Sequence, residues 1–147
     1  MNIAHLVVPS LWLGLLVGVS FVATPVKFSA ASLSLPVALD IGRVTFAVFD
    51  DIEWVMLAAL VAAIVLSGSS PASRMAAMLL AVALLLQSAW LLPVLNQRVA
   101  AIIAGNNPSP SLDHIYYIAA DVAKAILLVA IVWNEANRMV RASVKAR

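Results

Sequence analysis

The chain has 147 residues, of which 64% are hydrophobic and only 11% are charged, and its mean hydropathy is +1.04. A soluble domain of this length carries far more charge, so the composition predicts an integral membrane protein. The formal charge of +2, without a basic cluster, argues against nucleic acid as a partner, and the lack of cysteine excludes disulfides and thiolate metal sites.

Four apolar runs predict an all-α fold, an integral membrane up-down-up-down four-helix bundle. A hydrocarbon core of about 30 Å requires about 20 helical residues, and three of the runs reach this length readily. The second run reaches it only if its helix begins near Thr45, which brings Asp50, Asp51 and Glu53 close to the membrane. The expected spans, all in one transmembrane domain of residues 1–147, are about 3–25, 46–68, 74–98 and 114–134.

The first run is expected to be a retained span. No basic residue precedes it, and its apolar stretch is longer than the core of a normal signal peptide. Gly14 and Gly18 lie four residues apart within it, a spacing that allows close approach of another helix. We favour a close contact inside the bundle over a dimer face, although glycine is also simply common in membrane helices.

The distribution of charge predicts the orientation of the spans. Five basic residues fall in the segments on one side and three in the segments on the other: Arg74, Arg138, Arg141, Lys145 and Arg147 against Lys27, Arg43 and Arg98. By the positive-inside rule both termini are cytoplasmic, in a multi-pass protein of the cell membrane, taken to be a bacterial inner membrane. Six of the seven acidic residues, all except Glu135, fall on the outer side.

The stretch DHIYYIAADVAK, residues 113–124, places polar side chains inside the fourth run. On a helix His114, Tyr117, Asp121 and Lys124 lie within an arc of about 80°. A charge at the centre of a membrane costs about 2.5–3.5 kcal/mol on insertion scales, so these residues are expected to face the bundle interior. Asp121 and Lys124 can pair at i, i+3, and Tyr117 can donate to Asp121. The stripe is either a local ion pair or part of a polar site.

Two other spans offer polar residues at the same level. Gln87, Trp90 and Arg98 share one side of the third span, and Asp50 and Glu53 lie one turn apart in the second. We therefore predict a polar cavity that is open to the outer side. Asp121 and Lys124 form its centre, His114 and Tyr117 its entrance, and Gln87, Trp90 and Glu53 its opposite wall, with Asp50, Asn96 and Arg98 as further ligand-binding candidates.

Each predicted span carries one tryptophan. Trp54 and Trp133 fall at the two membrane interfaces, where tryptophan commonly anchors a helix. Trp12 lies near the middle of its span and Trp90 about one turn inside, so both are expected to pack internally.

The sequence holds no established catalytic pattern, and it leaves open both enzymatic activity and the identity of any cofactor. A metal site is a weaker option. His114 and Asp121 are two helical turns apart, about 10.5 Å along the axis, so they cannot ligate one ion unaided. A site that joins His114 to Asp50 or Glu53 across helices is the remaining arrangement, and our prediction is that the protein holds no metal.

Three segments carry a family resemblance: WLGLLVGVSFVATPVKF, WLLPVLNQRVAAIIAG and HIYYIAADVAKAILL. The chain resembles small four-span bacterial integral membrane proteins of uncharacterised function, a likeness that implies the fold. It is more distantly similar to anthrone-oxygenase-like membrane proteins, which also place an Asn-containing LN element after their third span. That second likeness implies cofactor-free oxidation of an aromatic polyketide, with Asn96, Arg98 and His114 near the substrate.

The leading functional prediction is an integral membrane protein that binds or processes a small lipophilic or quinone-like molecule in the outward-facing cavity. The alternative is an accessory or assembly subunit of a larger membrane complex, with no chemistry of its own. A third possibility is a proton-coupled carrier, which with four spans requires a homo-oligomer. Membrane lipids are expected partners in every case.

Overall fold

The computed structural model describes residues 3–145, with Ser67 described by its backbone alone, and these residues form four long helices. The all-helical prediction is confirmed. Two of the long helices contain a π-helical segment, labelled η, between α-helical ones. In chain order the elements are α1 (Ala4–Leu16), η1 (Val17–Ala23), α2 (Thr24–Lys27), α3 (Leu35–Ser67), α4 (Pro71–Leu86), η2 (Gln87–Leu91), α5 (Leu92–Ile103) and α6 (Asp113–Lys145).

The helices extend beyond the predicted spans. α3 is 33 residues long and begins at Leu35, because Ser34 has an extended backbone and Pro36 occupies the first turn, where proline lacks only an N–H that is unsatisfied anyway. The residues from Leu35 to Val44, before the predicted start near Thr45, therefore form the first turns of α3. α6 is also 33 residues long and continues to Lys145.

Three of the long helices are apolar enough to cross a membrane: Ala4–Lys27, Pro71–Ile103 and Asp113–Lys145. These helices indicate a multi-pass membrane protein. α3 differs from them because Asp50, Asp51 and Glu53 lie at the start of its most apolar half. Glu53, however, is only 1% exposed and is not presented to lipid.

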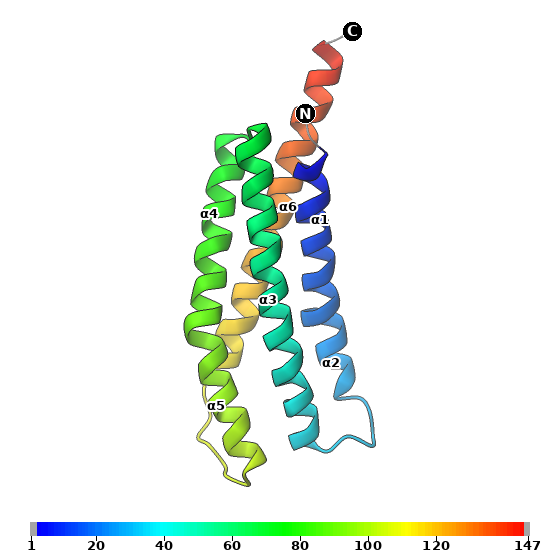
Figure 1. The fold of residues 1–147 in the computed structure, drawn as a ribbon. Coiled ribbons are helices and arrows are strands. Elements are labelled where there is room, and N and C mark those ends of the chain that lie inside the picture. The colour runs from blue at the N-terminus through cyan, green and yellow to red at the C-terminus, as the bar shows by residue number, and fades with distance from the viewer. Residues whose placement is uncertain (1–2, 146–147) are drawn as a thin grey trace.

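The four long helices lie side by side, and consecutive helices run in opposite directions (Figure 1). α1 begins and α6 ends at one end of the bundle, which also holds the short turn between α3 and α4; we call it the turn end. The connections 28–34 and 104–112 lie at the other end, the loop end. α1 and α4 each pack against both α3 and α6, so α3 and α6 occupy one diagonal of the bundle.

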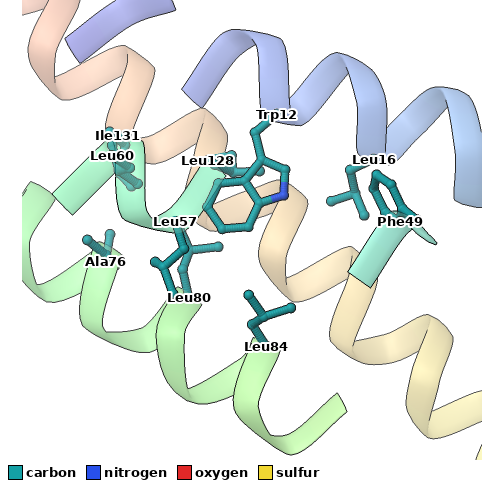
Figure 2. Packing of buried hydrophobic residues seen from close by; sticks show 11 residues of the cluster. Trp12, Leu16, Phe49, Leu57, Leu60, Ala76, Leu80, Leu84, Leu128 and Ile131 are labelled. Atoms are coloured by element: carbon teal, nitrogen blue, oxygen red, sulfur yellow. The ribbon is translucent and has the colours of Figure 1, made fainter. Parts of the chain in front are cut away.

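Trp12 stands at the centre of the apolar core and is completely buried. Leu57 of α3, Leu80 of α4 and Leu128 of α6 lie around its ring (Figure 2). The prediction that Trp12 packs internally is confirmed. The first helix thus contributes one large aromatic side chain to the core, and most residues around it are aliphatic, with Phe49 of α3 as a second aromatic residue.

The prediction that Trp90 packs internally is wrong, since Trp90 is 55% exposed. The inward face of this helix runs through Leu80, Leu84, Gln87 and Leu91 at the spacing of three or four residues that any helical face has, and Trp90 lies about 100° from Leu91. Gln87 is buried, and the next buried residue is Leu91 rather than Trp90. The inward face of the third long helix therefore passes to one side of the indole.

The expected close contact at Gly14 and Gly18 is also wrong. Both glycines are exposed, and a Cβ added at either would meet nothing within 4 Å. Trp12 and Leu16 form the inward face of α1, and a residue two positions away points about 200° from that face. The two glycines therefore lie on the outside of the bundle.

Each π-helical segment ends two residues before a proline. η1 ends at Ala23 before Pro25, and η2 ends at Leu91 before Pro93. Proline lacks an N–H, and its ring collides with the carbonyl four residues earlier in a regular α-helix. The wider turn accommodates that ring without breaking the helix, and both such turns lie toward the loop end (Figure 1).

Candidate functional site

Lys124 is the centre of a fully buried ion network. Its ammonium lies 2.6 Å from each carboxylate oxygen of Glu53 and 3.1 Å from Oδ1 of Asp121. The exposed fraction of the Lys124 side chain is 0%. The ammonium is thus bound by two carboxylates and withdrawn from both lipid and water.

All four long helices contribute to this network. Asp121 and Lys124 are one turn apart on α6, and Glu53 reaches Lys124 from α3 across the diagonal of the bundle. Trp12 of α1 donates its indole N–H to Oε1 of Glu53 over 2.9 Å. Gln87, in η2, donates to Oδ1 of Asp121 over 2.9 Å. We call these five residues the ion network.

The ion network carries an unbalanced formal charge. Glu53 and Asp121 contribute two negative charges when ionised, and Lys124 contributes one positive charge, which leaves −1. Buried charges are tolerated when they are paired and hydrogen-bonded, and here every charged group has at least two polar partners. One uncharged polar atom of the ion network lacks a partner: the side-chain oxygen of Gln87 is a buried acceptor with no hydrogen-bond donor among residues 3–145.

A pocket of about 240 Å³ lies at the loop end, lined by residues of α2, α3, α5 and α6. We call it the loop-end pocket. Most of its walls are apolar, with Phe46 from α3 and Leu95, Val99 and Ile102 from α5. Its polar lining includes Thr24, Asn96, Tyr117 and four basic residues, Lys27, Arg43, Arg98 and His114. No carboxylate among the described residues lines it.

Tyr117 separates the loop-end pocket from the ion network. Its side chain lines the pocket and is only 4% exposed, while its backbone carbonyl accepts from Gln87 over 3.3 Å. Its ring meets that of Phe46 edge to face, with the centroids 5.3 Å apart. The predicted hydrogen bond from Tyr117 to Asp121 is absent from the described contacts: the Tyr117 ring packs on Phe46 at the pocket, and Asp121 is bonded to Gln87 and Lys124 instead.

The predicted site residues separate into two groups. Asp121, Lys124, Gln87 and Glu53 belong to the ion network, whereas His114, Tyr117, Asn96 and Arg98 line the loop-end pocket. Asp50 belongs to neither group, and its carboxylate accepts a hydrogen bond from Ser88. Trp90 faces outward. Glu53, Asp121 and Lys124 therefore do not line the pocket, because they pair with one another in the core.

Four residues of these sites were not predicted from the sequence: Trp12 in the ion network, Lys27 and Gly42 in the pocket, and Ser88 beside Asp50. A buried indole N–H requires an acceptor, so a tryptophan in mid-span was a usable signal for a carboxylate on another helix. Ser88 also accepts from the indole of Trp54 over 3.0 Å. Nothing in the local sequence around Gly42 indicates that it lies against a pocket.

A second polar cluster lies at the turn end. The carboxylate of Glu135 accepts from the Ser73 hydroxyl over 2.6 Å and from the backbone N–H of Ser70 over 3.3 Å, and Arg138 binds its other oxygen over 2.8 Å. Arg138 also reaches the carbonyl of Gly68. The cluster attaches the turn between α3 and α4 to α6, which is a structural role.

The described residues contain no group of three His, Asp or Glu side chains placed to hold a metal ion. His114 is exposed at the loop-end pocket, while Glu53 is committed to Lys124 in the core. The arrangement that would join His114 to Glu53 or Asp50 is not formed.

Replacement of Trp12 by Phe tests the role of the indole in the ion network. Phe keeps an aromatic ring in the core, but it is smaller than Trp and leaves Glu53 without one hydrogen-bond donor, so we expect the free energy of unfolding to fall by at least about 1–2 kcal/mol. Titration with SDS in mixed micelles measures this change. The exposed Trp90→Phe is the matched control and should change stability by less than about 0.5 kcal/mol. Equal effects of the two variants would contradict the assigned role of Trp12.

No family model, no curated protein and no solved structure matches the chain. The resemblance to small four-span bacterial membrane proteins and to anthrone-oxygenase-like proteins therefore stays a prediction. Asn96, Arg98 and His114, which the second likeness places near a substrate, do line one pocket.

Proposed function

We propose that this protein binds a small lipophilic or quinone-like molecule in the loop-end pocket. The observation that carries the proposal is the pocket itself, a cavity between four helices with apolar walls and a few convergent polar side chains. Binding sites for small molecules commonly have this construction, with apolar surface for affinity and polar groups for orientation. Tyr117 forms the base of the site, and His114 lies at its exposed rim.

The ion network supports this proposal as a scaffold. It ties all four long helices together beside the pocket, and Gln87 bonds both Asp121 and the backbone of Tyr117. A pocket at the end of a helical bundle keeps its shape only if the helices beneath it are fixed. The buried charges of Glu53, Asp121 and Lys124 thus hold Tyr117 and the helices around it in place, and they do not contact the ligand.

The orientation in the membrane belongs to the same proposal. Arg74, Arg138, Arg141 and Lys145 accompany the turn end, and Lys27, Arg43 and Arg98 accompany the loop end. The positive-inside rule then gives an up-down-up-down topology with cytoplasmic termini and a pocket that faces outward. In a bacterial cell this arrangement corresponds to the inner membrane, with the pocket open to the periplasmic side.

A tryptophan placed in the pocket tests the proposal. Val99 lines the pocket, whereas the neighbouring Ala100 is exposed and does not, so Val99→Trp and Ala100→Trp are a matched pair. A ligand that binds only the folded state raises its melting temperature. With 1,4-naphthoquinone as probe, we expect the wild type and Ala100→Trp to gain thermal stability and Val99→Trp to gain none. The chain has no cysteine, so the probe cannot add to a thiol.

The result that contradicts the proposal is equally specific. If the quinone raises the melting temperature of Val99→Trp as much as that of Ala100→Trp, it binds elsewhere on the protein. If it raises none of the three, the pocket does not bind this class of molecule.

One observation favours the alternative role as a subunit of a larger complex. Gly14 and Gly18 lie exposed on the outer face of α1, where their lack of a side chain leaves the helix backbone accessible. Such faces allow close packing of a second membrane helix. Purification in mild detergent distinguishes the two roles, because a subunit co-purifies with a stoichiometric partner and Gly14→Leu releases that partner.

A further inference from the structure

We propose that the loop-end pocket selects a small apolar molecule with a single anionic group, and that Lys27 binds the anion. This inference rests on the proposed function and specifies its ligand. Four basic residues line the pocket, and no carboxylate among residues 3–145 does. The lining is therefore electrostatically complementary to negative charge, and its low-dielectric walls strengthen that attraction.

Of the three Lys and Arg side chains that line this pocket, Lys27 is the one available to a ligand, while His114, the fourth basic residue, is exposed at the rim. Arg43 is bound to Asp40, with its two guanidinium nitrogens 3.0 and 2.6 Å from Oδ1. Arg98 donates to the backbone carbonyl of Ser109. Lys27 forms no ion pair and no hydrogen bond from its ammonium within the part of the chain that the structure describes. Its three N–H donors therefore lack an acceptor that an anionic ligand would supply.

Gly42 explains why the Lys27 ammonium lies at the pocket. Gly42 is buried in α3 and lines the pocket, and a Cβ added to it would collide with Nζ of Lys27. The missing side chain therefore leaves the space that the ammonium occupies. The ammonium is also 5.1 Å from the centroid of the Phe28 ring, within the range of a cation–π contact. Lys27 is thus half-buried and held against the pocket.

The size and lining of the pocket restrict the rest of the ligand. A volume of about 240 Å³ is somewhat below the range of about 300–1,000 Å³ that is common for pockets holding drug-sized ligands. Apart from its polar and basic residues the pocket is lined by aliphatic and aromatic side chains, with Phe46 and Val99 among them. One or two rings or a short alkyl chain fit this space, whereas a complete membrane lipid does not.

A matched pair of probes tests the anion preference. 2-Hydroxy-1,4-naphthoquinone is an anion at neutral pH, and 1,4-naphthoquinone is neutral and nearly the same size. Dissociation constants come from thermal shifts of the full chain in nanodiscs of phosphatidylcholine, which carry no net charge. We expect the wild type to bind the anionic quinone at least about tenfold more tightly than the neutral quinone, because one hydrogen-bonded charge pair contributes affinity of that size.

Substitutions at Lys27 and Gly42 locate the effect. Lys27→Met keeps the length of the side chain and should abolish the preference, while the affinity for the neutral quinone changes less than about twofold. Lys27→Arg should retain the preference. Gly42→Ala, which displaces the ammonium without removing it, should reduce the preference. The control is Arg74→Met, which removes the same charge from an exposed position at the turn end and should leave the preference intact.

The outcomes separate this inference from the proposed function. Equal affinities of the two probes, both lost in Val99→Trp, would overturn the anion preference and leave the proposed function standing. If neither probe binds, both proposals fail. If Lys27→Met and Gly42→Ala both keep the full preference, Lys27 is not the anion-binding residue. If inorganic phosphate alone, or phosphatidylglycerol in the nanodisc, displaces the probe, the site takes a free anion or a lipid headgroup, which overturns the small-molecule assignment.

Discussion

Replacement of Lys124 by Met is expected to cause a severe loss of stability. The variant leaves the carboxylates of Glu53 and Asp121 buried without a counter-charge, and removal of one partner from a buried ion pair costs about 3–5 kcal/mol. The free energy of unfolding, from SDS titration in mixed micelles, should fall by that amount, or the variant should fail to fold. Ile126→Met, on the exposed face of the same helix, is the control and should be nearly neutral.

The formal charge of −1 on the ion network predicts that its members differ in how much their replacement costs. Glu53→Gln removes one of two carboxylates and leaves Lys124 paired with Asp121, a neutral pair, so it should cost less than Lys124→Met. The triple variant Lys124→Met, Glu53→Gln, Asp121→Asn buries no charge and should recover a large part of the stability lost in Lys124→Met. If the triple variant is as unstable as Lys124→Met, packing rather than uncompensated charge explains the loss.

The second large effect is expected at the turn end, from Glu135→Ala. This substitution removes the acceptor of the Ser73 hydroxyl and the Ser70 N–H and the counter-ion of Arg138. Hydrogen bonds to a charged group are individually worth about 1.5–3 kcal/mol, and their loss here is partly offset by water, so we expect about 2–3 kcal/mol. The same SDS titration measures it.

The conservative Glu135→Gln isolates the role of the charge. Its amide oxygen can still accept from Ser73, so it should lose less stability than Glu135→Ala. Asn137→Ala, a polar residue on the same helix without a hydrogen bond from its side chain in the described structure, is the control. A change in Glu135→Ala no larger than in Asn137→Ala would show that the cluster does not stabilise the turn.

Much of the architecture follows from hydrophobic patterning. The apolar runs predict four helices, and the inward direction of Tyr117, Asp121 and Lys124 follows from their common face on α6, where all three are buried. The cost of charge in lipid made that direction a strong expectation. These features depend on local sequence and on the chemistry of the membrane, both of which are readable without the fold.

What the sequence could not provide depends on the packing of distant segments. The pairing of Lys124 with Glu53 joins residues 71 positions apart across the diagonal of the bundle, a geometry that no spacing encodes. The prediction for Trp90 rested on its depth in the span, which does not determine the direction of a side chain, and Trp90 lies beside the inward face formed by Leu84, Gln87 and Leu91.

The division of the predicted cavity has the same origin. The candidates Glu53 and His114 were assigned to one site because both lie toward the outer side. In the structure Glu53 and Asp121 pair with Lys124 in the core, and the pocket is lined by apolar, neutral polar and basic side chains. A buried charge is stable only when it is paired and hydrogen-bonded, and for this reason the charged candidates lie in the ion network and not in the wall of the pocket.

The most direct test of this account is native mass spectrometry of the protein extracted from its own membrane. We expect the wild type and Ala100→Trp to carry a small-molecule adduct, and Val99→Trp, with its pocket filled, to carry none. A wild-type protein without an adduct, or the same adduct on Val99→Trp, would contradict the assignment of the loop-end pocket as a binding site.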